Sequence, residues 1–67
     1  MNQHELNGVQ VQLPWWRPGT IYTIRPAYEI DRVTVIWHSP QEGKTDCTTF
    51  RVAEVEEFLN TGAWERV

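Results

Sequence analysis

The stretch Arg32-Val33-Thr34-Val35-Ile36-Trp37-His38 is the clearest β-strand of the sequence, and it decides the fold class. Most of its residues are β-branched or aromatic, the types that fit a pleated, half-buried surface. Side chains of a strand alternate between two faces, so one face carries Val33, Val35 and Trp37, and the other carries Thr34, Ile36 and His38. The apolar residues on both faces predict a central strand that is partly covered on each side.

Shorter strands are predicted on both sides of this stretch. Residues 9–13 alternate between apolar and polar, which is typical of a strand with one buried face. Residues 20–25 are rich in β-branched and aromatic types and predict a second strand. Residues 47–51 resume this character after a polar loop at 39–46, so we expect them to form a hairpin with the central strand.

The hydrophobic period changes after residue 51. A helix over about residues 52–60 would carry on one face Val52, Val55, Phe58 and Leu59. Gly62 follows as a residue suited to the left-handed position that ends many helices. Residues 63–67 are predicted to return as a short strand or an extended tail. Because so short a helix is not stable alone, we expect it to lie on the sheet.

These elements predict a mainly β fold, of the β-rich α+β kind. Two architectures fit: a small antiparallel SH3-like open barrel, or a four- to five-stranded sheet, each with one short C-terminal helix. A single domain is expected over residues 9–67, preceded by a flexible N-terminal segment over residues 1–8. A chain of 67 residues is too short for a two-domain enzyme or a dinucleotide-binding fold.

The C-terminal part of the chain contains Phe50-Arg51-Val52, then Val55-Glu56-Glu57-Phe58-Leu59, then Gly62-Ala63-Trp64. This pattern resembles the ending of many small uncharacterised phage and bacterial proteins, in which a sheet is followed by a short helix, a glycine and a tryptophan. The resemblance implies a packing arrangement and a small accessory protein, one that a phage could encode. It implies no catalytic or binding residues.

Charge and cysteine content narrow the function classes. Six basic side chains against nine acidic ones give a net charge of −3, which argues against a dedicated DNA-binding protein. Cys47 is the single cysteine, so no internal disulfide can form, although small secreted domains usually need such bonds. The chain start lacks the features of a signal peptide. We therefore expect a cytoplasmic protein, located in the host cytoplasm if the chain is viral.

An aromatic surface is the predicted binding site. Trp15 and Trp16 are adjacent, and adjacent strand residues face opposite sides, so one of the two rings is expected to reach solvent. Arg17, Tyr22 and Tyr28 are its candidate neighbours. The predicted function is a non-catalytic interaction module that binds a protein partner, or a second copy of itself. In the structural alternative, both tryptophan rings cover the ends of a thin barrel.

The sequence also contains residues that two other function classes would need. The same aromatic residues, with Arg17, Arg25 and Arg32, could stack and hold single-stranded nucleic acid. His4, His38, Asp46 and Cys47 are residue types that could bind a metal, and Cys47 with His38 could form a nucleophile pair. Their spacing matches no metal motif and no catalytic triad. We therefore expect no enzymatic activity, no cofactor and no metal.

Overall fold

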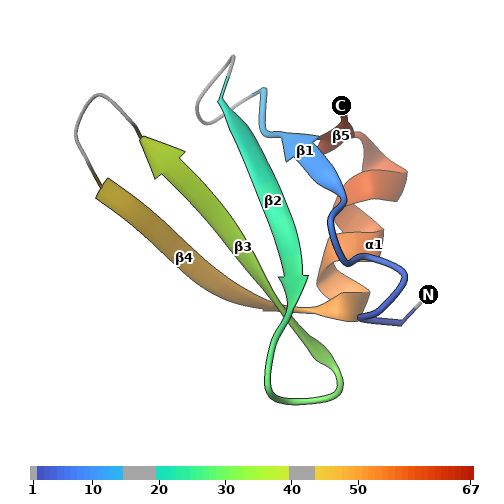
Figure 1. Ribbon diagram of the computed structural model, residues 1–67. Helices are drawn as coiled ribbons and strands as arrows, with labels where there is room; N and C mark the ends of the chain where they lie inside the picture. Colours follow the sequence, from blue (N-terminus) through green and yellow to red (C-terminus); the bar gives the residue numbers. More distant parts are fainter. Residues whose placement is uncertain (1, 15–19, 40–43) are drawn as a thin grey trace.

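The computed structural model describes residues 2–14, 20–39 and 44–67. Its strands form one antiparallel sheet in the order β4-β3-β2-β1-β5 (Figure 1). These strands are β1 (Gln10–Gln12), β2 (Ile21–Pro26), β3 (Arg32–Ser39), β4 (Lys44–Arg51) and β5 (Glu65–Arg66). The helix α1 (Val52–Thr61) connects β4 to β5. The structure confirms the predicted fold class, which is mainly β with one short helix.

Element bounds differ from the prediction chiefly at β4. This strand begins at Lys44, three residues before the predicted start at Cys47. Its polar residues Thr45 and Asp46 belong to a ladder with His38 and Trp37 of β3. A ladder needs only backbone groups, and polar side chains at an exposed edge carry no desolvation cost, so the hairpin extends beyond its apolar residues.

The inner face of the sheet, which packs against α1, carries the predicted apolar residues. Val33 and Val35 of β3 are buried there, and Trp37 is half-buried. The neighbouring strands add residues in the same cross-strand rows, because residues opposite each other in a ladder share a face. The buried core consists of Leu6, Val11, Leu13, Tyr22, Ile24, Val33, Val35, Val52, Val55 and Trp64.

Three aromatic rings tie α1 to the sheet. The Trp64 ring stacks on Phe58, with 5.0 Å between ring centroids, and meets Phe50 of β4 edge-on at 5.2 Å. The N–H of Trp64 donates to the carbonyl of Phe58. Gly62 allows the chain to turn back toward the helix after its last residue, because it adopts the left-handed conformation at φ 82°. The Trp64 ring therefore contacts both α1 and β4.

The N-terminal segment is part of the packed domain. Leu6 has no exposed surface, and Gln3 is 6% exposed. Gly8 joins the segment to the sheet, because its N–H donates to the carbonyl of Ile24 at 2.8 Å. The expectation that residues 1–8 form a flexible segment does not include these contacts. A segment that starts polar can still supply single residues to a thin core.

Replacing Leu6 by alanine is expected to lower the free energy of unfolding by about 2–5 kcal/mol, because the side chain is fully buried. The matched control is Glu5→Ala at the exposed neighbouring position, which should change stability by less than about 0.5 kcal/mol. Denaturant unfolding of both variants measures the difference. Equal, small effects would mean that the segment does not contribute to the core in solution.

Candidate binding surface

The structure places two of the five predicted binding residues. Trp15, Trp16 and Arg17 lie outside the described residues. Tyr22 is buried, 8% exposed, and lies opposite Trp37 on the inner face of the sheet. Tyr28 follows the other end of β2, in the turn that leads to β3, and is fully exposed. The two tyrosines therefore do not share one surface.

The described candidate site is the turn formed by residues 27–31, here called the Tyr28 turn. Two large apolar side chains reach solvent from it, with relative exposures of 105% for Tyr28 and 84% for Ile30. Between and beside them lie the exposed acidic residues Glu29 and Asp31. Large apolar side chains that project together from a domain often mark an interaction site.

The backbone of the Tyr28 turn is fixed by hydrogen bonds. The N–H of Ala27 donates to the carbonyl of Arg32, and the N–H of Arg32 donates to the carbonyl of Glu29, each at 3.1 Å. From the start of α1, the N–H of Val52 donates to the carbonyl of Asp31 at 2.9 Å. The turn is thus bonded within itself and to the helix that follows β4.

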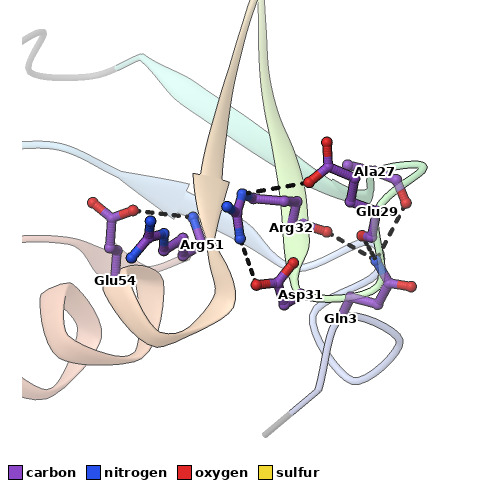
Figure 2. A network of polar contacts seen from close by, with 7 residues as sticks. All are labelled: Gln3, Ala27, Glu29, Asp31, Arg32, Arg51 and Glu54. Carbon is purple, nitrogen blue, oxygen red and sulfur yellow. Dashed lines mark hydrogen bonds and ion pairs between the residues drawn. The ribbon is translucent and has the colours of Figure 1, made fainter.

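Gln3 adds a third attachment from the N-terminal segment. Its Nε2 lies 3.2 Å from the carbonyl oxygen of Ala27, and 2.9 Å from those of Glu29 and Arg32 (Figure 2). A side-chain amide nitrogen carries two N–H donors and no acceptor, so it suits a site ringed by three carbonyls. These bonds span 24 to 29 residues of sequence and close the turn onto the chain start.

The charges around the turn leave it slightly negative. Arg32 contacts both acidic residues: its Nη1 donates to Oδ2 of Asp31, and its Nε lies 3.9 Å from Oε2 of Glu29 (Figure 2). Such exposed pairs add little stability. Their consequence is electrostatic, because two carboxylates and one guanidinium surround two apolar side chains. A complementary surface would be apolar with a positive rim.

Gln3 and Ile30 are not among the binding residues predicted from the sequence. The available signal for Ile30 was its position, since it sits with Tyr28 in a short connection between two strands, where large apolar residues have little core to reach. Gln3 carries no comparable signal. Its role depends on a contact with residues more than 20 positions away, which no local pattern encodes.

The outer face of the sheet offers little for nucleic-acid stacking. Arg25 is exposed there, and its Nη1 lies 3.3 Å from Oδ1 of Asn7. Its described neighbours on this face are aliphatic or polar, among them Ile21, Thr23, Thr34, Ile36 and Cys47. Arg32 is engaged by the carboxylates of the Tyr28 turn. The described residues therefore bring together no platform of rings and arginines, and that hypothesis depends on Trp15, Trp16 and Arg17.

The candidate nucleophile pair lies on neighbouring strands, and its two residues are not directly opposite each other in the ladder. In the ladder between β3 and β4, Cys47 lies opposite Ile36, and His38 lies opposite Thr45. Within the described ranges, no three side chains of the types His, Cys, Asp and Glu lie close enough to hold a metal ion. The same residues include no helix with the length and apolar character needed to cross a membrane.

Comparison with protein-family models, with curated proteins and with solved structures finds no match to the chain. The function proposed below therefore rests on the chain's own residues, and first on the Tyr28 turn.

Proposed function

We propose that this protein is a non-catalytic interaction module that binds a protein partner through the Tyr28 turn. One observation carries the proposal: two large apolar side chains are exposed on a turn whose backbone is held by long-range hydrogen bonds. Ordering a loop on binding costs free energy, and a turn that is already ordered avoids that cost. Binding residues commonly sit on loops that a rigid scaffold positions.

The mode of binding follows from the side chains. Tyr28 would enter an apolar pocket of the partner, with Ile30 packed beside it at the pocket wall. Tyrosine is enriched among the few residues that dominate interface energies, because its ring is large and has few rotatable bonds. Glu29 and Asp31 would face a basic rim on the partner, while Arg32 keeps their charge partly balanced.

Trp15, Trp16 and Arg17 stay in the proposal as a second aromatic contact. Their candidacy rests on the adjacent tryptophans of the sequence. Tyr22 has a supporting part only, since it is buried beneath the sheet.

The SH3-like barrel and the accessory role belong to this proposal too. Supporting the barrel, four consecutive strands form a meander, and β5 returns after α1 to pair with β1. Strands β4 and β5 lie at the two ends of the described sheet, so such a barrel would be open. An accessory role, which a phage could encode, is part of the proposal, and the single cysteine, Cys47, supports a protein that acts in the cytoplasm.

The test compares protein capture by the wild-type chain and by Tyr28→Ala and Ile30→Ala variants. We expect each substitution to weaken the binding of a specific partner by at least about 2 kcal/mol, which is about a 30-fold loss of affinity. The free energy of unfolding should change by less than about 0.5 kcal/mol. Val67→Ala, at another exposed apolar residue, is the matched control and should capture normally. If both turn variants still capture the partner and Trp15→Ala or Trp16→Ala does not, the binding site lies at the tryptophans and not at the Tyr28 turn.

A further inference from the structure

The described part of the N-terminal segment, residues 2–8, holds its shape through its own hydrogen bonds. Oδ1 of Asn2 accepts the N–H groups of His4 at 2.9 Å and of Glu5 at 3.0 Å. Further along the segment, the N–H of Asn7 donates to the carbonyl of His4 at 3.2 Å. Asparagine side chains commonly bond to backbone groups a short way along the chain, which fixes a turn. The backbone that carries Gln3 is therefore ordered by contacts that do not involve the Gln3 side chain.

The same segment is anchored to the domain at two places beyond Gln3. Leu6 is fully buried in the core. The N–H of Gly8 donates to the carbonyl of Ile24 in β2. Attachment of the segment to the domain therefore does not require Gln3. The bonds that the Gln3 amide makes have their main effect at their other end, in the Tyr28 turn.

The Gln3 amide bonds to the peptide groups that precede both exposed apolar side chains. The carbonyl of Ala27 belongs to the peptide group that leads into Tyr28. The carbonyl of Glu29 belongs to the peptide group that leads into Ile30. Nε2 of Gln3 lies 3.2 Å from the first of these oxygens and 2.9 Å from the second (Figure 2). Because a peptide group is planar, fixing its oxygen fixes the plane from which the next residue starts, and so the direction in which its side chain leaves the turn.

The bonds that the turn makes within itself hold its base. The N–H of Ala27 donates to the carbonyl of Arg32, and the N–H of Arg32 donates to the carbonyl of Glu29. Both bonds would remain without Gln3, whereas the carbonyl of Ala27 would lose its bond to Nε2. The base of the turn would therefore stay closed, while the peptide group before Tyr28 would gain freedom to rotate.

We propose that Gln3 is a positioning residue for the binding site, through which the N-terminal segment sets the affinity of the Tyr28 turn for its protein partner. The inference rests on the proposed function, and it assigns Gln3 no contact with the partner, because the side chain is only 6% exposed. When a fraction of the molecules holds the binding conformation, the apparent dissociation constant rises by the inverse of that fraction. Gln3 raises the fraction by holding Tyr28 in one orientation. A change that releases Gln3 from the turn weakens binding without altering the contact surface.

Gln3→Met is the test variant, because its side chain is similar in length and has no N–H donor. The first control is Val11→Ala, which removes buried apolar atoms in β1 and leaves the bonds of the turn in place. The second control is Glu5→Ala, at an exposed position of the same segment. All variants are measured under conditions in which they are fully folded. A loss shared with Val11→Ala would come from general destabilisation, whereas a loss confined to Gln3→Met would come from the turn.

The first readout is the order of the turn, which can be measured without a partner. Backbone amide relaxation by NMR gives an order parameter for each residue. We expect the value for Tyr28 to fall from about 0.85, typical of a rigid backbone, to below about 0.6 in Gln3→Met. Both controls should keep the higher value. The amide of Arg32, at the base of the turn, should change little in any variant.

The second readout is the affinity for the protein that the wild-type chain captures and Tyr28→Ala does not. We expect Gln3→Met to bind this protein at least about tenfold more weakly, which corresponds to a binding-competent fraction of about one tenth. Both controls should bind it like the wild-type chain.

Two results would overturn the inference while the proposed function stands. The first is an unchanged order parameter at Tyr28 in Gln3→Met. The second is capture by Gln3→Met with wild-type affinity when Tyr28→Ala has lost it. If Tyr28→Ala itself captures the partner normally, the proposed function fails, and the link from Gln3 to affinity fails with it.

Discussion

Trp64→Ala is expected to remove most of the free energy of unfolding and to bring the protein close to its unfolding midpoint under conditions in which the wild-type chain is folded. The side chain is 2% exposed and joins the end of α1 to β4 through Phe58 and Phe50. Removing so large a buried ring costs about 3–5 kcal/mol. Small domains have total stabilities of about 5 kcal/mol or little more, so this single loss is comparable with the whole.

Circular dichroism and denaturant unfolding measure the effect. Trp64→Phe is the control, because it keeps a ring against Phe58 and should lose clearly less stability than the alanine variant. Tyr28→Ala is the second control, since its ring is fully exposed. A Trp64→Ala protein that loses less than about 1 kcal/mol would show that the aromatic cluster does not hold the helix to the sheet.

Gln3→Glu is expected to destabilise the protein by several kcal/mol, although the two side chains have nearly the same shape. The change replaces an N–H donor group with a carboxylate oxygen that faces the carbonyls of Ala27, Glu29 and Arg32. At 6% exposure, water cannot solvate the charge, and no described cation bonds to this site. A buried, unpaired charge is among the most costly single changes in a folded protein.

The pH dependence of Gln3→Glu separates charge from packing. Burial and the facing carbonyls disfavour the charged form, so the introduced carboxyl group has a higher pKa in the folded state than in the unfolded state, where it is about 4.3. The folded state then binds more protons, and stability relative to the wild type falls as the pH rises above that value. Denaturant unfolding between pH 4 and 7 measures this trend, with Gln3→Met as the uncharged control. A penalty independent of pH would contradict the proposed donor role of Gln3.

Local sequence patterns were sufficient for the sheet and the helix. Alternation placed Val33, Val35 and Trp37 on one face, and the structure packs that face against α1. The change of period after residue 51 and the glycine at 62 placed the helix within one residue of its observed end at Thr61. These patterns work because each depends on neighbours within one turn or one strand.

The candidate site was less predictable, because it depends on contacts between distant parts of the chain. Nothing near Gln3 indicates that its amide will meet the turn after β2. Tyr22 and Tyr28 were predicted to be neighbours in one aromatic surface. In the structure, Tyr22 lies within β2 and its ring is buried in the core, whereas Tyr28 lies beyond the end of β2 and its ring is in solvent. Their positions at opposite ends of β2 separate them, and the residue type alone does not indicate these positions.

The central claim is that Tyr28 lies at the contact with a protein partner, and site-specific photo-crosslinking tests it most directly. A photoreactive phenylalanine analogue is placed at position 28, and in a separate protein at position 67, in cells that express the full chain. The proposed site predicts one discrete adduct with another protein from position 28 and no specific adduct from position 67. An absence of adducts at position 28, or the same adducts from positions 28 and 67, would contradict it.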